Sequence, residues 1–348
     1  MSLETIRVGI VGLGGNTRLR HVPGLRECAD VEIVGVCNRS PESTAKAAAE
    51  FGIPKTYERW QDLAADPDID AVMIGTWPYL HCPITLAALE HGKHVLTEAR
   101  MAMNVSEARQ MLAASQQRPD LVTQIVPSPV GLTVHRTVMR LIQAGFLGEL
   151  REFAVLGTND GYADPSLPRH WRQTAKYSGT NMLTLGILHE TLMRWVPSPV
   201  RVMAQTQVFT PERVDEASGR PAPVETPDSV HVLAELPGRT RGIYHFSGVV
   251  SHGPGLQIHL YGSEGTLNLV AGESETLFGG HRGGELTPIP IPAEEAGGWR
   301  VEAEFIGAIR GEEPVQFTDF ASGVCYMEFT EAVARSAASG QAVALASV

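Results

Sequence analysis

The sequence predicts an α/β protein with two domains: an N-terminal doubly wound parallel sheet, and a C-terminal α+β domain with a large, mostly antiparallel sheet. Strand and helix patterns alternate up to about residue 126, as in a parallel sheet whose strands are joined by helices. Beyond residue 149, strand-like runs dominate. The chain has 348 residues, the length of two ordinary domains. We therefore expect one domain over residues 1–126 and another over residues 127–348.

In the first domain, short apolar runs alternate with longer segments of helical periodicity. The expected strands cover residues 6–11, 31–37, 70–75, 93–96 and 121–126. The expected helices cover residues 17–28, 41–51, 60–66, 81–91 and 105–117. Ligands of such sheets bind beyond the carboxyl ends of the strands, so we expect the functional site there.

The second domain is expected to be a sheet with helices on one face. Its expected strands cover residues 150–157, 200–209, 229–236, 240–246, 256–261 and 266–269. Its expected helices cover residues 132–144, 182–195, 296–310 and 319–338, and residues 210–227 form a long hairpin loop. A sheet of this size needs cover on both faces, and a partner subunit commonly supplies the second. We therefore expect a homodimer or homotetramer.

A glycine turn links the first strand to the first helix, which is the arrangement that holds a dinucleotide pyrophosphate. Gly12 permits the tight turn, and Gly14 lets the backbone approach the phosphates. The helix that follows offers free N–H groups to the anion. The third glycine position is occupied by Thr17, which would set the helix slightly further from the strand. The cofactor-binding residues expected here are Gly12, Gly14, Gly15, Asn16 and Thr17.

The end of the second strand lacks the usual acidic residue and has Asn38, Arg39 and Ser40 instead. A carboxylate there would bind ribose hydroxyls and repel a 2′-phosphate. Asn38 can bond a hydroxyl without that repulsion, while Arg39 and Ser40 can hold a phosphate. The sequence therefore favours NADP over NAD as the cofactor. The alternative is a glycine turn in an α/β domain that binds no nucleotide.

Composition excludes several other classes of protein. The net charge of −11 argues against nucleic acid or an anionic membrane as a partner. The cysteines are far apart and form no CxxC pair, so we expect reduced thiols and no zinc site: Cys28, Cys37, Cys82 and Cys325. The histidines of the sheet region lack metal-ligand spacing, so we expect no metal. A core strand that starts at Ile6 leaves no room for a signal peptide, and we expect a cytoplasmic location.

Several segments together resemble the glucose–fructose oxidoreductase/inositol dehydrogenase family, called Gfo/Idh/MocA. They are IRVGIVGLGG…HVPGL at 6–25, IDAVMIGT…H at 69–81, ALEHGKHVLTEA at 88–99, LIQAGFLGEL at 141–150 and SGTNMLTLGILH at 178–189. The resemblance covers nearly the whole chain. It implies a Rossmann domain followed by an α+β domain, a nicotinamide nucleotide, and a sugar, cyclitol or related polyol as substrate.

The family's catalytic segments are altered in this chain. The family has Glu-Lys-Pro where this sequence has Glu98, Ala99 and Arg100. Ala99 cannot orient a hydroxyl, and an arginine is a poor proton shuttle. The family's Asp-x-Gly-x-His-x-x-Asp segment corresponds to residues 184–192, where Thr184 takes an acidic position. His189 is the expected acid/base, and the alternative is a histidine satisfied in the interior.

A polar loop precedes that segment, and the resemblance places it over the substrate. Trp171 offers a flat face for a sugar ring, and Arg172 can bind hydroxyls or a carboxylate. Lys176 or Tyr177 is expected to replace the missing lysine. The substrate-binding residues expected are His170, Trp171, Arg172 and Thr184. The alternative is an exposed loop with ordinary charges.

Further cofactor contacts are expected at two other strand ends. Thr76 and Trp77 follow the third strand and border the nucleotide, although Trp77 can equally serve packing. His81 either contacts the cofactor or makes a local capping contact. Glu98 lies near the nicotinamide ribose if the family geometry holds.

We therefore expect an NAD(P)-dependent oxidoreductase that acts on a sugar or polyol by hydride transfer. One rival is a glycosidase or lyase that uses a bound nucleotide for transient oxidation and re-reduction, without net redox change. The other rival is a pseudo-dehydrogenase that binds nucleotide or sugar without catalysis, because Ala99 and Thr184 replace the family's lysine and aspartate.

Overall fold

The computed structural model describes residues 5–345 and divides into two compact units. Unit 1 contains Met1–Pro127 and Arg300–Val324, and unit 2 contains Ser128–Trp299 and Cys325–Val348. The segment at 300–324 was assigned to the second domain from the sequence, and the structure corrects this. Its helix periodicity predicts a buried face but does not reveal which core that face joins.

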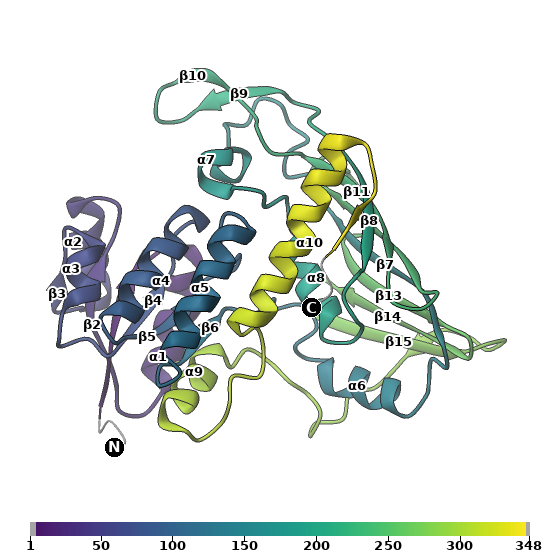
Figure 1. Ribbon diagram of the computed structural model, residues 1–348, viewed down its shortest axis with the longest axis horizontal. Helices are drawn as coiled ribbons and strands as arrows, with labels where there is room; N and C mark the ends of the chain where they lie inside the picture. The colour runs from purple at the N-terminus through teal and green to yellow at the C-terminus, as the bar shows by residue number, and fades with distance from the viewer. Residues whose placement is uncertain (1–4, 346–348) are drawn as a thin grey trace. The chain divides into compact units, whose positions relative to one another are not determined.

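Unit 1 is a six-stranded sheet with the order β3-β2-β1-β4-β5-β6, and all its strand pairs are parallel (Figure 1). Its strands are β1 (Ile6–Val11), β2 (Val31–Cys37), β3 (Lys55–Thr56), β4 (Ala71–Ile74), β5 (His94–Thr97) and β6 (Thr123–Ile125). The strand order reverses between β1 and β4. The crevice at the carboxyl ends of these two strands is therefore the switch point where such sheets bind ligands.

Helices connect the strands of unit 1. They are α1 (Val22–Glu27), α2 (Pro41–Phe51), α3 (Trp60–Ala65), α4 (His81–Glu90) and α5 (Val105–Gln117), with the short π-helix η1 (Thr17–His21) and the short 3₁₀-helix η2 (Pro78–Leu80). The returning segment adds α9 (Val301–Arg310), which packs against α1. Because β2, α2 and α5 have the bounds expected from the sequence, local periodicity was sufficient to place them.

At the switch point, the segment after β1 and the segment after β4 approach each other closely. Gly12 has a φ of +87°, and a Cβ there would lie 2.7 Å from the backbone nitrogen of Thr76. A Cβ on Gly75 would overlap the Thr17 hydroxyl oxygen. Thr17 is buried, and its hydroxyl donates to the Gly12 carbonyl at 3.2 Å. Thr17 therefore fits at the third glycine position because Gly75, directly after β4, has no side chain.

Unit 2 is a nine-stranded sheet with the order β16-β15-β14-β13-β7-β12-β11-β8-β17. Among the described strand pairs of this nine-stranded sheet, only β7–β12 is parallel. The strands are β7 (Leu150–Thr158), β8 (Arg201–Gln207), β11 (Ser229–Glu235), β12 (Arg241–Ser247), β13 (Leu256–Gly262), β14 (Gly265–Ala271), β15 (Glu275–His281), β16 (Thr287–Pro288) and β17 (Val343–Ala344). This confirms the expected fold class. β15 was missed because its Gly279 and Gly280 are poor strand formers.

The remaining elements of unit 2 are helices and one hairpin. The helices are α6 (His135–Gln143), the short η3 (Trp171–Gln173) and α7 (Ala175–Ser178), α8 (Leu185–Met193) and α10 (Phe320–Ser339), the last of which begins in unit 1. A two-stranded hairpin, β9 (Glu212–Asp215) with β10 (Arg220–Pro223), occupies the segment expected to be a long hairpin loop.

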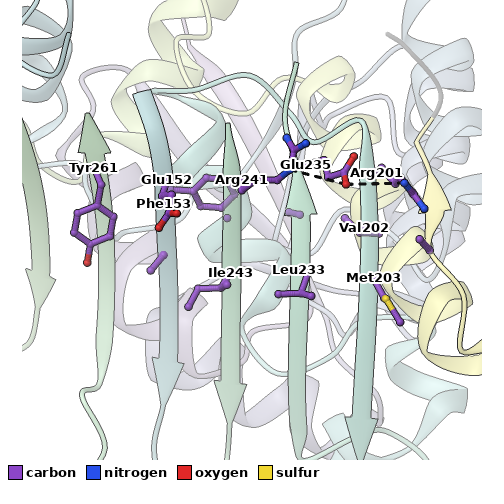
Figure 2. Close-up of a pocket in the computed structure, with 14 residues that line it drawn as sticks. Glu152, Phe153, Arg201, Val202, Met203, Leu233, Glu235, Arg241, Ile243 and Tyr261 are labelled. Carbon is purple, nitrogen blue, oxygen red and sulfur yellow. Dashed lines mark ion pairs between the residues drawn. The ribbon is translucent and has the colours of Figure 1, made fainter. Parts of the chain in front are cut away.

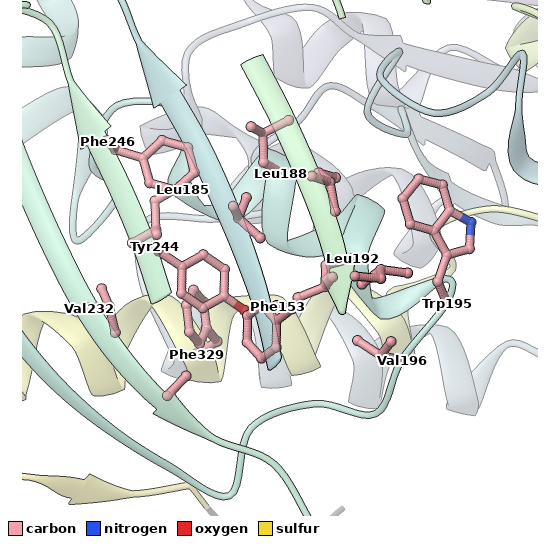
Figure 3. Packing of buried hydrophobic residues seen from close by; sticks show 14 of the residues in the cluster. Phe153, Leu185, Leu188, Leu192, Trp195, Val196, Val232, Tyr244, Phe246 and Phe329 are labelled. Carbon is pink, nitrogen blue, oxygen red and sulfur yellow. The ribbon is translucent and has the colours of Figure 1, made fainter. Parts of the chain in front are cut away.

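The core of unit 2 lies between the sheet and the helices α8 and α10. Leu188 of α8 and Phe329 of α10 pack with Tyr244 and Phe246 of β12 and with Val155 of β7 (Figure 3). Successive strand residues point to opposite faces, so the same strands carry a second set of side chains on the other face.

The other face of this sheet bears a shallow groove of about 510 Å³. Met203, Leu233 and Ile243 lie side by side across β8, β11 and β12 (Figure 2). Leu233 is 61% exposed, and Met203 and Ile243 are also exposed. The groove is therefore an apolar surface that no described residue covers.

Candidate active site

The glycine loop of unit 1 presents an open backbone surface. A Cβ on Gly15 would meet nothing within 4 Å, and one on Gly14 would meet only the Gly75 carbonyl, at 3.6 Å. The first i to i−4 hydrogen bond runs from Arg18 N to Gly14 O at 3.0 Å. The amides of Gly15, Asn16 and Thr17 precede it, so they have no partner within the helix. This loop fits an anion such as a pyrophosphate.

Asn38 ties this loop to the turn that follows β2. Its Oδ1 accepts from Leu13 N at 2.7 Å, and its Nδ2 donates to Ser43 O at 3.0 Å. Each end of the amide thus makes one hydrogen bond within the protein, which leaves a second N–H of Nδ2 and a second lone pair of Oδ1 for a ligand. Asn38 therefore fixes the glycine loop, and its expected contact with a ribose hydroxyl stays a prediction.

Of the three residues after β2, Arg39 is the one whose side chain makes no hydrogen bond to another described residue. Ser40 caps α2, with its hydroxyl accepting from Ser43 N at 3.2 Å. Arg39 is exposed, and its guanidinium carbon lies 6.0 Å from the centre of the Trp77 ring. No carboxylate of the described residues pairs with Arg39. An unpaired cation beside an aromatic ring is therefore present at the end of β2.

His81 supports the turn after β4 from within the core. Its ring nitrogens lie 2.8 Å from Arg100 O and 3.0 Å from Thr76 O. Burial lowers the pKa of His81, and a neutral ring donates to only one of these carbonyls. Of the two roles considered, the structure shows the local contact. The Thr76 hydroxyl is buried and has no hydrogen-bond partner among residues 5–345.

Glu98, at the carboxyl end of β5, belongs to a network of charged groups. Its Oε1 accepts from Asn16 Nδ2 at 2.5 Å and lies 3.0 Å from His21 Nε2. The other ring nitrogen of His21, Nδ1, contacts the Glu302 carboxylate. His21 and Glu302 are almost completely buried. An imidazole is therefore held between two carboxylates, one at the sheet edge and one on α9.

The charges of this network follow from its geometry. Burial alone would lower the pKa of His21, but hydrogen bonds with Glu302 and Glu98 outweigh it and raise the pKa to about 9. Burial likewise opposes ionisation of Glu98, yet the His21 contact holds the pKa of this carboxyl below its usual range. At neutral pH the His21 imidazolium therefore lies next to the ionised Glu98, and its other ring nitrogen contacts Glu302.

The structure thus gathers donors and acceptors suited to a dinucleotide within unit 1. The amides of the glycine loop suit the pyrophosphate, and Arg39 with Trp77 lies at the end of β2. Glu98 presents a carboxylate at the end of β5. Gly14, Gly15, Asn16, Arg39 and Glu98 would hold the nucleotide, which supplies a hydride acceptor or donor when bound.

Sequence reasoning missed His21 and Glu302. His21 lies in the segment HVPGL, which contributed to the family resemblance but received no role. A signal was present in both segments, because each residue is polar at a position that its helix buries. His21 and Glu302 lie 281 positions apart, and a single sequence gives no indication that two such distant residues pair.

In unit 2, His189 lies in the hydrophobic core. Its side chain is 0% exposed, its Nδ1 lies 2.8 Å from the Tyr244 hydroxyl, and its ring stacks on Phe329 with 3.7 Å between centres. Its Nε2 has no hydrogen-bond partner among the described residues. Burial lowers the pKa of His189 to about 3. A neutral, inaccessible imidazole is the alternative considered above, and this placement argues against the acid/base role.

The spacing of the family motif explains why the expectation failed. In Asp-x-Gly-x-His, with Thr184 at the first position, the histidine position falls on Leu188. His189 is one residue further along α8, which turns its side chain by about 100° around the helix. The chain therefore has a leucine where the family has its histidine.

The loop before α8 brings several expected residues together. The Arg172 guanidinium carbon lies 4.4 Å from the centre of the Trp171 ring, so Arg172 covers one face expected to receive a sugar. The His170 imidazole accepts from Arg172 N at 3.2 Å and caps this turn. The Lys176 ammonium lies 5.7 Å from the centre of the Tyr177 ring. Thr184 is half-buried at the start of α8.

Two further properties bear on function. Within residues 5–345, no group of three or more histidine, cysteine, aspartate or glutamate side chains is placed to hold a metal ion. In the same residues, no helix combines the length and apolarity needed to span a bilayer.

The burial of His189 leads to a testable expectation. Tyr244→Phe and His189→Leu each leave one buried polar partner without the other, so each should lower the free energy of unfolding by about 1–3 kcal/mol. The double variant removes both polar groups and should cost less than the sum of the two singles. Urea unfolding of all four proteins measures this. Additive costs would show that the two side chains do not interact.

Comparisons with known proteins place the chain in a family. Residues 6–125 match the family described as "Oxidoreductase family, NAD-binding Rossmann fold" (GFO_IDH_MocA), and residues 135–268 match the GFO/IDH/MocA C-terminal domain. The chain is 31% identical over 184 residues to 1,5-anhydro-D-fructose reductase of Ensifer adhaerens, spanning 53% of this chain and 54% of that enzyme. It is 29% identical over 148 residues to levoglucosan dehydrogenase of Pseudarthrobacter phenanthrenivorans, spanning 42% and 38%.

Solved structures share the whole fold. Levoglucosan dehydrogenase in its apo form superposes with a TM-score of 0.88 at 22% identity, covering 99% of this chain and 100% of that one. A levoglucosan dehydrogenase complex with NADH and L-sorbose gives 0.85 at 23% identity, with the same coverage. The two domain models matched at residues 6–125 and 135–268 show that the chain belongs to the Gfo/Idh/MocA family of oxidoreductases.

Proposed function

We propose that this protein oxidises or reduces a sugar, cyclitol or related polyol by hydride transfer to or from a nicotinamide nucleotide. The observation that carries the proposal is the pairing of an open glycine loop with the ionised Glu98 in unit 1. The loop provides amides for a pyrophosphate, and Glu98 provides an acceptor for hydroxyl groups. The sequence relatives named above act on sugars according to their names, which supports this substrate class.

Proton transfer in this reaction needs a group other than His189. A base with a pKa of about 3 inside a closed core takes little part in proton transfer at neutral pH. Tyr177 and Lys176 are the expected replacements for the missing family lysine. Their side chains lie together on α7, with the ammonium 5.7 Å from the centre of the Tyr177 ring, so a proton donor and a hydroxyl are close to each other. We assign proton transfer to this pair.

A catalytically inactive relative is the second candidate. It is favoured by Ala99 at the family's lysine position and by the burial of His189. In that case the protein would bind nucleotide without turnover. A nucleotide-assisted glycosidase or lyase would instead turn over without net change in the nucleotide.

A turnover screen separates these candidates. We expect a panel of sugars and cyclitols to include a substrate whose oxidation reduces NADP or NAD, followed by nicotinamide absorbance. Tyr177→Phe should lower kcat by about 100-fold or more because it removes the acid/base group, without lowering nucleotide affinity. Product formation without net nicotinamide reduction would support the lyase. Binding without any turnover would support the inactive relative.

We further propose that the nucleotide is NADP. Arg39 is an exposed cation at the end of β2, where a carboxylate would select NAD. A guanidinium binds a phosphate through paired hydrogen bonds. A solved structure of the same fold, at 23% identity, holds NADH, so the fold alone does not select NADP and the proposal rests on Arg39.

Replacing the cation tests this assignment. We expect the parent to bind NADPH more tightly than NADH, and Arg39→Ala to weaken NADPH binding about tenfold while NADH binding stays within twofold. Arg59→Ala, which removes an exposed arginine before α3, is the matched control. Calorimetric titration measures all three proteins. Equal affinity of the parent for NADH and NADPH would contradict the NADP assignment.

We also propose that the open face of the unit 2 sheet joins two copies of the chain. Met203, Leu233 and Ile243 form an apolar stripe across this face. Beside the stripe lie three charged residues on the same strands, Arg201, Glu235 and Arg241, with Glu235 Oε1 3.9 Å from each guanidinium (Figure 2). A face that carries apolar groups beside both signs of charge can pair with itself about a two-fold axis. It also supplies the cover that a large sheet needs.

Introducing a charged side chain into the apolar stripe should separate the two copies of the chain. We expect the parent to be a dimer or tetramer by light scattering, and Leu233→Asp to shift it to a smaller species because a carboxylate would be buried without a partner. Leu286→Asp changes an exposed leucine outside the groove and should leave the mass unchanged. A monomeric parent, or a Leu233→Asp protein of parental mass, would contradict this interface.

A further inference from the structure

The topology of unit 1 determines which half of a dinucleotide each strand end would meet. The pyrophosphate binds at the glycine loop after β1, and the adenosine ribose lies at the end of β2. The order β2-β1-β4-β5 puts β5 on the other side of β1. The nicotinamide half therefore extends toward the end of β5, where Glu98 lies.

The two oxygens of Glu98 are used unequally. Oε1 faces both Asn16 Nδ2 and His21 Nε2. Oε2 accepts only from Ala99 N, at 3.2 Å, among the described residues. Oε2 thus retains capacity for a further hydrogen bond, while Oε1 fixes the orientation of the group.

On this basis, and resting on the proposed nucleotide function, we propose that His21 and Glu302 are positioning residues for the nicotinamide half of the cofactor. They hold Glu98 ionised and turned so that Oε2 accepts a hydrogen bond from a hydroxyl of the nicotinamide ribose. His21 and Glu302 act through Glu98 and do not touch the cofactor themselves.

The local packing shows why Glu302 is part of this unit. A Cβ on Gly24 of α1 would lie 2.5 Å from Glu302 Oε2, so the carboxylate reaches His21 over a glycine. Without Glu302, the buried His21 imidazole has only one neighbouring carboxylate, so less electrostatic attraction stabilises its charged form against the cost of burial. Loss of the charge on His21 removes the cation that keeps the Glu98 side chain in place.

The chain offers a matched control two residues further along the same helix. Glu304 is also buried on α9, but its Oε1 accepts from Gln124 Nε2 at 2.9 Å and from Gln316 N at 3.0 Å. Glu304→Gln therefore removes a buried carboxylate that does not contact His21. A general disturbance of α9 would affect both variants, whereas a positioning role affects one.

The experiment compares whole nucleotides with their adenosine fragments. The parent, Glu302→Gln and Glu304→Gln are titrated with NADPH, NADH, 2′,5′-ADP and ADP. We expect Glu302→Gln to weaken NADPH and NADH binding by about tenfold, because a charged hydrogen bond is lost, and to leave the two fragments unchanged. Glu304→Gln should change none of the four affinities.

The outcomes separate the two proposals. Equal weakening of whole nucleotides and fragments by Glu302→Gln would mean a merely structural role and would overturn the inference while leaving the nucleotide function intact. No change at all would overturn it as well. A parent that binds neither NADPH nor NADH would overturn both.

A measurement on the parent covers the case in which Glu302→Gln does not fold. The pKa of His21 is raised from 6.5 to about 9, so its charge is present below that value and is lost as pH rises through it. NADPH affinity should therefore fall above about pH 9 while that of 2′,5′-ADP falls less. Equal pH profiles for NADPH and 2′,5′-ADP would contradict the positioning role.

Besides Glu98 and Glu302, which face His21, two further titratable groups lie close to this unit. They are the Cys28 thiol, near Glu302, and the His81 imidazole, near Glu98. Burial raises the pKa of Cys28 and lowers that of His81, so only Cys28 can ionise in the same alkaline range. Cys28→Ser should retain the pH profile of the parent, and loss of the profile would assign it to the thiol.

Discussion

A buried imidazolium between two carboxylates connects parts of unit 1 that are far apart in the sequence. His21 belongs to the helix after the glycine loop, Glu98 directly follows β5, and Glu302 lies in the first turn of α9. Removing one member of such a set leaves an uncompensated buried charge, which typically costs about 3–5 kcal/mol. The contact of Glu302 with His21 thus helps to hold the returning segment, residues 300–324, in unit 1.

The two buried histidines show how their surroundings decide their chemistry. His21 has a carboxylate at each ring nitrogen and is charged, whereas His189 has one phenol and an aromatic stack and is neutral. Both are fully buried, so exposure alone does not distinguish them. In unit 1 the charge supports an acceptor at a strand end. In unit 2 the neutral ring fills a core position.

The sequence was sufficient for the architecture because its information is local. Buried strands such as β1 and β2 are apolar runs, and the glycine turn follows directly from them. Their packing partners in the sheet follow from the alternation of strands and helices. The segment at 300–324 was misassigned because an amphipathic helix signals a buried face but not its partner.

The site could be predicted only in part. The glycine loop and Glu98 were expected, since each adjoins a strand end. The contact of Asn38 with Leu13 was not foreseen because the two residues lie 25 positions apart. The burial of His189 was not foreseen because a shift of one residue turns a helical side chain into the core. Ala99 and Thr184 replace the family's lysine and aspartate, and whether the protein is still active depends on whether other side chains take over their roles. The sequence was therefore compatible with both an active enzyme and an inactive relative.

The most direct test is a crystal structure of the protein with NADPH bound. We expect the pyrophosphate on the amides of Gly15, Asn16 and Thr17, the 2′-phosphate on Arg39, and the nicotinamide ribose within hydrogen-bond distance of Glu98 Oε2. A nucleotide bound away from the carboxyl ends of β1, β2 and β5, or a Glu98 side chain turned away from the ribose, would contradict the proposed binding mode.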